Sequence, residues 1–102
     1  MKKSVIADVK ILPCATESAS LSHYVAACDD ILKQANDISY QITPMATIIQ
    51  GSLERVLELV QEMHEVPFTM GIKRVVTSVS IDDRRDKQIS MESKVEAVNR
   101  KL

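Results

Sequence analysis

The side chains that could carry out chemistry are few and scattered. Cys14 and His23 are the only cysteine–histidine pair close in sequence, nine residues apart, with no elbow motif and no carboxylate placed to orient a base. His23 and His64 do not form an HxxxH or HxxE arrangement, although Glu65 follows His64 directly, so we expect no metal site and no cofactor. His64 remains a candidate polar group for a small ligand.

The stretch at residues 43–47 is the second place where chemistry could occur. Thr43 and Thr47 supply hydroxyls, Met45 supplies a thioether, and Pro44 interrupts two flanking segments that alternate like strands. Proline lacks a ladder donor, so it marks a turn, a bulge or an edge. The residues therefore predict either an ordinary strand turn or the lip of a pocket.

Two further features limit the class of protein. The chain has two glycines and no glycine-rich phosphate loop, which argues against nucleotide binding through such a loop. The charged run at residues 82–87 could clamp an anion through Arg84 and Arg85 or form ion pairs between subunits. Its balanced signs favour a simply solvated segment.

Composition describes a small single domain, residues 1–102. Thirteen basic and 14 acidic residues give a formal net charge of −1, and only three aromatic side chains are present, so nucleic acid is not an expected partner. No apolar run is long enough to span a bilayer and no signal peptide is recognisable, so no membrane role is expected. The two cysteines lack CxxC spacing, and we expect a cytoplasmic protein with reduced thiols.

Hydrophobic periodicity divides the chain into seven elements. Ser20 is a plausible N-cap for the first helix, Gly51 and Ser52 predict a turn and a cap, and Pro67 should kink or end the second helix. The predicted elements are strand 4–12, helix 21–35, strand 38–43, strand 46–50, a helix from residue 53, strand 74–81 and a helix from residue 91 after a cap at Ser90.

Each predicted helix has one apolar stripe, and the first strand has one fully apolar face. The stripes are Leu21, Tyr24, Val25, Cys28, Leu32 and Ala35; then Leu53, Val56, Leu57, Val60 and Met63; then Met91, Val95, Val98 and Leu102. The apolar strand face is Val5, Ala7, Val9 and Ile11.

The order of the elements predicts the fold class. Two crossovers flanking a central hairpin give an α+β, ferredoxin-like βαββαβ sandwich with an extra C-terminal helix. Two helices would cover one face of the sheet and leave the other open. A half-apolar open face suggests packing against another subunit. The residues expected there are Ile6, Asp8, Lys10, Gln41, Thr43, Val76, Ser78 and Ser80.

Six segments in register resemble one family, the small thiamine-binding-protein-like (YkoF-like) proteins. The matching segments are ADVKILP at 7–13, SHYVA at 22–26, TPMAT at 43–47, MHE at 63–65, KRVVTS at 73–78 and IDDRRDK at 81–87. The resemblance covers almost the whole chain. It implies a ferredoxin-like fold assembled as a dimer, or as a tetramer of two dimers, that binds thiamine or its hydroxymethylpyrimidine part without catalysis.

The resemblance also implies a ligand site. It puts Thr43, Met45 and Thr47 near the ligand and matches His64 to a helix histidine of the family. Ala46, where glycine is common, and Cys14, where a small or aliphatic residue is common, depart from the pattern.

Residue chemistry adds a possible contact for each part of thiamine. Asp8 could pair with a ring nitrogen or an exocyclic amine, and Tyr24 or Tyr40 could face a thiazolium. Two rival functions stay open: an interaction module without a ligand, and an enzyme that uses Cys14 or His64.

Overall fold

The structure, a computed structural model, describes residues 4–14 and 21–101. The predicted helix cap at Ser20 and the last stripe residue, Leu102, lie outside the described residues. The elements are β1 (Ser4–Pro13), α1 (Leu21–Lys33), β2 (Ser39–Ile42), β3 (Thr47–Ser52), α2 (Leu53–Thr69), β4 (Val75–Asp82) and α3 (Met91–Lys101).

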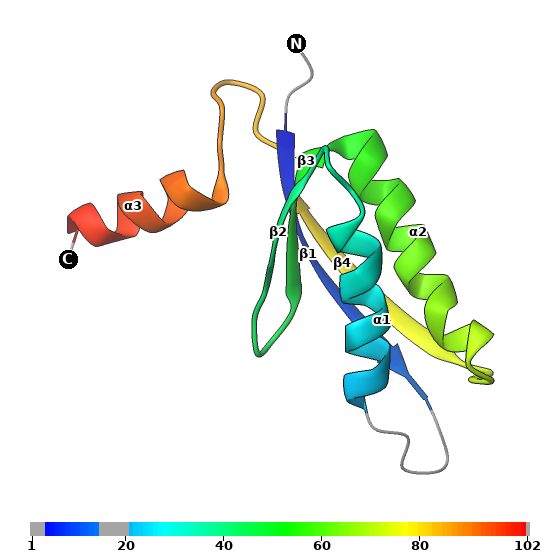
Figure 1. The fold of residues 1–102 in the computed structure, drawn as a ribbon. Helices are drawn as coiled ribbons and strands as arrows, with labels where there is room; N and C mark the ends of the chain where they lie inside the picture. The colour runs from blue at the N-terminus through cyan, green and yellow to red at the C-terminus, as the bar shows by residue number, and fades with distance from the viewer. Residues whose placement is uncertain (1–3, 15–20, 102) are drawn as a thin grey trace.

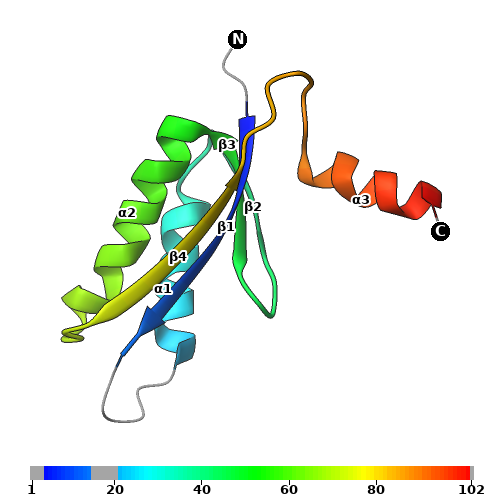
Figure 2. The ribbon, with the colours of Figure 1, turned by 180° about the vertical axis from the view of Figure 1, so that it is seen from behind.

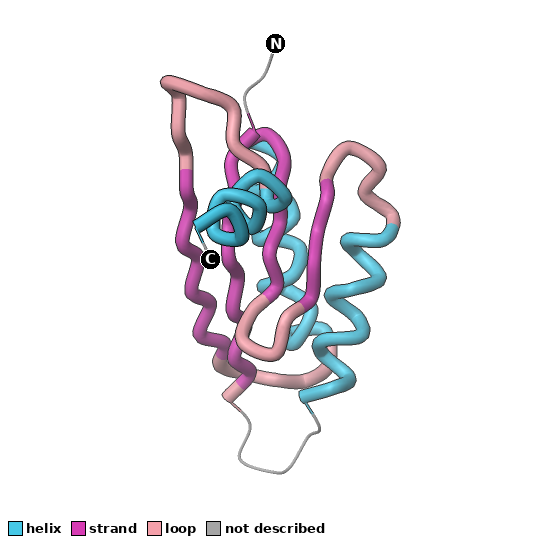
Figure 3. Tube along the Cα trace, turned by 90° about the vertical axis from the view of Figure 1, so that its left-hand side faces the viewer, coloured by secondary structure: helices cyan, strands magenta, loops and turns pink. Residues whose placement is uncertain are grey.

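The four strands form one antiparallel sheet in the order β2-β3-β1-β4. Helices α1 and α2 cover one face of this sheet, and α3 lies on the opposite side, away from it (Figures 1 and 3). Figure 2 shows the molecule from behind, with β4 and β1 in front of the two covering helices. The predicted ferredoxin-like sandwich with an extra C-terminal helix is confirmed.

Strand register decides which residues face the helices. Ala7 is paired with Ile49 on β3 and with Ile81 on β4, so these three side chains point to the same face. The helix-facing residues of β1 and β3 form the core with the inner faces of α1 and α2. The buried core residues are Val5, Ala7, Val9, Cys28, Leu32, Ala35, Ile49, Val56, Leu59, Val60 and Met63.

In the two helices that cover the sheet, two predicted stripe residues are largely exposed. Val25 and Leu57 are both 48% exposed, whereas Leu59, which the predicted stripe omits, is 1% exposed. The i, i+3 and i, i+4 spacings define an apolar stripe that is wider than the contact with the sheet. The exact rotation of each helix about its axis therefore cannot be predicted from the stripe alone.

At Gly51 and Ser52 the predicted turn is absent, but the predicted helix cap is present. β3 continues through Gly51 and Ser52, which pair with Val5 and Ser4, so no turn occurs there. Ser52 is nevertheless the cap of α2, since its side chain accepts a hydrogen bond from the Arg55 backbone N–H at 3.3 Å.

Pro67 lies inside the last turn of α2, which continues to Thr69, so the proline does not end the helix. Proline cannot donate to the carbonyl four residues back, that of Met63. The Cys28 thiol on α1 lies 3.8 Å from this carbonyl and donates to it. The neighbouring helix thereby satisfies an acceptor that the proline leaves without its helical partner.

Candidate functional site

A small, largely apolar cavity lies between α1, α2 and the helix-covered face of the sheet. Its volume is about 120 Å³. β1, α1 and α2 supply most of the wall, and β3 contributes its first residue, Thr47. The lining residues are Val9, Ile11, Leu12, Tyr24, Val25, Cys28, Thr47 and Met63.

Two hydroxyl groups in this wall have no hydrogen-bond partner among the described residues. Within the part of the chain that the structure describes, neither Thr47 nor Tyr24 makes a hydrogen bond through its side chain. A hydroxyl offers one donor and two acceptor sites. The cavity therefore combines apolar walls with two available polar groups, which is the usual make-up of a small-molecule site.

Cys28 is the third polar side chain in the wall, and it is already engaged. Its thiol donates to the Met63 carbonyl, and burial raises the pKa of the thiol to about 11. Cys28 is consequently a neutral thiol at physiological pH. Such a group contributes to the wall by packing and is a poor nucleophile, because the thiolate is the reactive form.

Residues 43–47 form the turn that leads into this cavity. The Thr43 hydroxyl donates to the Ala46 carbonyl at 2.7 Å and accepts from the backbone N–H groups of Ala46 at 3.0 Å and Met45 at 3.3 Å. All the bonding capacity of this hydroxyl is used within the turn. Met45 is exposed beside it, and Ile42, paired with Thr47 across the two strands, is exposed on the same face.

Asp8 and His64 lie elsewhere. Asp8 points to the face of the sheet opposite α1 and α2, because its β1 neighbours Ala7 and Val9 face the helices. His64 on α2 reaches β4, where its Nδ1 atom lies 2.6 Å from the Thr77 hydroxyl oxygen. β4 and β2 are the two edges of the sheet, so His64 lies across the sheet from the turn at residues 43–47.

The structure thus brings together only part of the predicted site. Thr47 lines the cavity, and Met45 lies in the turn directly before it. Asp8 and His64 are each separated from these two residues. Tyr40, considered for a thiazolium, does not line the cavity; burial and a hydrogen bond with Asp29 raise its pKa. Sequence reasoning placed Val9, Cys28 and Met63 in the core but did not identify them as a cavity wall.

Other candidate groups are occupied locally. In the segment after β4, Arg84 donates to both carboxylate oxygens of Asp86, and Arg85 pairs with Asp83, as expected for a solvated run. The Cys14 thiol contacts the Leu12 carbonyl at 3.8 Å. Over residues 4–14 and 21–101, no three His, Cys, Asp or Glu side chains are grouped closely enough to hold a metal ion.

Comparisons with known proteins agree with this architecture. The fold and cavity define a ferredoxin-like α+β domain with a small internal cavity. Residues 7–99 match the family model described as thiamine-binding protein, and the chain belongs to that family. The UPF0045 protein YqgV of Bacillus subtilis is 50% identical over 100 residues, covering 95% of this chain and 96% of that protein. A UPF0045 protein of Staphylococcus xylosus is 45% identical over 100 residues, covering 95% and 94%.

Solved structures show the same fold. The hypothetical protein MJ1052 of Methanocaldococcus jannaschii superposes with a TM-score of 0.83 at 29% identity, covering 95% of this chain and 97% of that one. A Thermotoga maritima protein proposed to act in thiamine biosynthesis or salvage superposes with a TM-score of 0.75 at 23% identity, covering 93% and 98%.

Among the described helices, none combines the length and the apolar character needed to cross a membrane.

Proposed function

We propose that this protein binds thiamine, or its hydroxymethylpyrimidine part, without catalysing a reaction on it. The observation that carries the proposal is the apolar cavity lined by Thr47 and Tyr24, whose hydroxyls have no hydrogen-bond partner among the described residues. Membership of the thiamine-binding protein family supports the choice of ligand.

The size of the cavity indicates which part of the ligand enters. Sites for complete drug-sized ligands span roughly 300–1,000 Å³, whereas an engineered apolar cavity of about 150 Å³ holds one benzene ring. A cavity of about 120 Å³ suits a single ring. The pyrimidine would lie inside, where the two hydroxyls can bond its ring nitrogens and exocyclic amine, and the rest of thiamine would extend outward.

Exposed apolar side chains lie where that extension would run. Leu12 and Val25 line the cavity while remaining exposed, and Ile42 and Met45 are exposed at the neighbouring turn. Met45 has the flexibility to adapt to a ligand. In this proposal Thr43 acts through the shape of the turn, and the Ala46 methyl narrows the opening beside it.

Isothermal titration calorimetry with thiamine and with hydroxymethylpyrimidine tests the proposal. Loss of one neutral hydrogen bond corresponds to about a fivefold to tenfold drop in affinity, which is the expected effect of Thr47→Val. Met45→Ala should weaken thiamine more than hydroxymethylpyrimidine, because Met45 lies outside the ring cavity.

Thr77→Val is the matched control, since it makes the same substitution on β4, away from the cavity. It should leave both affinities unchanged. Absence of heat at millimolar ligand, or equal affinities for the wild-type protein and Thr47→Val, would overturn the proposal.

We also propose that the protein acts as a cytoplasmic homo-oligomer, a dimer or a tetramer. Val76 on β4 is 43% exposed at the side of the sheet that α1 and α2 leave uncovered. The same observation favours the second candidate function, an interaction module that works by self-association without a ligand. Titration separates the two, because such a module would associate and give no heat with either compound.

A further inference from the structure

The cavity between α1, α2 and the sheet has a buried end and an open end. Val9, Cys28 and Met63 form the buried end, here called the floor, and all three are buried. Leu12 and Val25 line the cavity while remaining exposed, so they mark the open end. A ligand that enters therefore reaches the floor with its leading edge and keeps its trailing edge near solvent.

The side chains of the floor offer a ligand no free hydrogen-bond donor. Val9 has a hydrocarbon side chain, and the thioether of Met63 is a weak acceptor that cannot donate. The Cys28 thiol has a proton to donate, but that proton is directed at the Met63 carbonyl oxygen. A carbonyl oxygen of a ligand placed against the floor would lose its hydrogen bonds to water without replacement.

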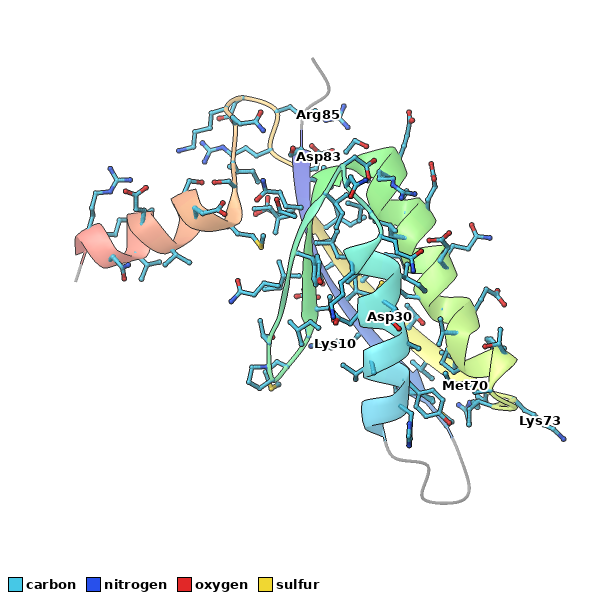
Figure 4. All side chains as sticks on the ribbon, viewed as in Figure 1. Lys10, Asp30, Met70, Lys73, Asp83 and Arg85 are labelled. Atoms are coloured by element: carbon cyan, nitrogen blue, oxygen red, sulfur yellow. The ribbon has the colours of Figure 1, made fainter. Side chains whose placement is uncertain are left out.

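The polar groups of the wall do not discriminate in the same way. Among the described residues that line the cavity, none is charged, and Asp30 on α1 is exposed and lies outside the wall (Figure 4). The hydroxyls of Thr47 and Tyr24 can each donate or accept a hydrogen bond. They can bond a ring nitrogen whether or not it carries a proton. Discrimination between one pyrimidine and another consequently depends on the floor.

We propose that Val9, Cys28 and Met63 make the cavity specific for pyrimidines that carry an alkyl group at ring position 2. This inference rests on the proposed function, in which the ring lies inside and the rest of thiamine leaves through the open end. That part is attached at ring position 5, directly opposite position 2, so the 2-methyl group of the thiamine pyrimidine contacts the floor. Pyrimidine nucleobases carry a carbonyl oxygen at position 2, which the floor leaves without a donor.

Isothermal titration calorimetry with a matched pair of ligands tests the proposal. Hydroxymethylpyrimidine and 5-hydroxymethylcytosine share their amino and hydroxymethyl groups, and they differ in carrying a methyl group or a carbonyl oxygen at position 2. The wild-type protein should bind 5-hydroxymethylcytosine at least about tenfold more weakly, because its carbonyl oxygen is buried without a partner. Hydroxymethylpyrimidine that lacks its 2-methyl group should bind about threefold to fivefold more weakly than the methylated compound.

Val9→Thr adds a hydroxyl to the floor and nearly preserves the shape of the side chain. It should reduce the ratio of the two affinities at least about threefold, because the new hydroxyl can donate to the carbonyl oxygen. Val5→Thr is the matched control, since Val5 is buried on the same face of β1 but does not line the cavity. It should keep the wild-type ratio, and thermal unfolding of both variants shows whether they are folded.

The possible outcomes separate this inference from the proposed function on which it rests. Equal wild-type affinities for hydroxymethylpyrimidine and 5-hydroxymethylcytosine would contradict the inference alone, and this comparison needs no variant. An unchanged ratio in folded Val9→Thr, or the same change in Val5→Thr, would show that the floor does not set the specificity. If neither pyrimidine binds, the proposed function fails and the inference fails with it.

Discussion

At the scale of single residues, the cysteine in the cavity wall is a structural group. The Cys28 thiol satisfies the carbonyl that Pro67 deprives of its helical donor, and this contact joins α1 to the last turns of α2. The thiol must be protonated to donate. The protonation of Cys28 therefore affects the stability of the fold and the dependence of that stability on pH.

We predict that Cys28 makes the protein less stable in mild alkali. Its pKa is raised from 9.0 to about 11 by burial, so above pH 9 the unfolded chain loses this proton more readily than the folded one. The stabilisation is complete below pH 9 and is lost as the pH rises through about 11. Denaturant unfolding from about pH 8 to about pH 11 should show a decline that Cys28→Ala lacks, by about 1 kcal/mol. Parallel pH profiles for the two proteins would contradict this assignment.

His64 illustrates how a residue picked from a resemblance can have a different local partner. Its ring bonds the Thr77 hydroxyl and lies edge-on to Phe68, with 5.5 Å between ring centroids. The Thr77 contact joins α2 to the β4 edge of the sheet, whereas the Phe68 contact lies within α2 itself. We therefore interpret His64 as a packing and hydrogen-bonding residue in this chain.

At the scale of elements, the β2–β3 hairpin connects sequence motif and cavity. Its turn is closed by the Thr43 hydroxyl and by a bond from the Thr43 backbone N–H to the Ala46 carbonyl at 2.9 Å. Thr47, four residues later, is the residue that reaches the cavity. The two threonines of the motif consequently have different roles, one within the turn and one in the wall.

This division of roles predicts that the same substitution destabilises the protein at one threonine and hardly affects stability at the other. Thr43→Val should lower the free energy of unfolding by about 1–2 kcal/mol, because it removes three hydrogen bonds that include exposed ones. Thr47→Val should leave that free energy nearly unchanged, since its hydroxyl has no partner in the described chain. Urea unfolding of both variants is the measurement, and equal losses in the two would refute the distinction.

At the scale of the whole molecule, α3 is the element with the least support from the chain. None of its described residues is buried, and Val95 and Val98 are 60% and 58% exposed. It is attached through its first turns, by the bonds to Gln50 and Asp82. The apolar side of α3 is therefore available for contact with a second copy.

We predict that α3 contributes to assembly and little to folding. Replacing Val95 and Val98 together by aspartate should leave the unfolding midpoint within about 2 °C of the wild-type value, because exposed positions contribute little to stability. Sedimentation velocity should show a shift of the wild-type dimer or tetramer toward smaller species. Glu96→Gln, an exposed change on the same helix, should retain the wild-type distribution. A wild-type protein that sediments as a monomer at micromolar concentration would contradict the self-association proposal.

The sequence by itself determined the fold and the two faces of the sheet. Alternation in β1 identified Val5, Ala7 and Val9 as core residues, and the order of strands and helices defined the ferredoxin-like topology. These features depend on local periodicity and short connections, which one sequence displays directly. The extra C-terminal helix was predictable for the same reason.

Only the tertiary structure decided which candidate groups lie together. Thr47 and Asp8 are both plausible ligand residues, yet strand register sends one to the helix-covered face and the other to the open face. Thr43 and Thr47 look alike in the motif, but one hydroxyl is used by its turn. Register, helix rotation and the competition for hydrogen bonds depend on residues far apart in the chain, so the composition and spacing of a motif cannot decide them.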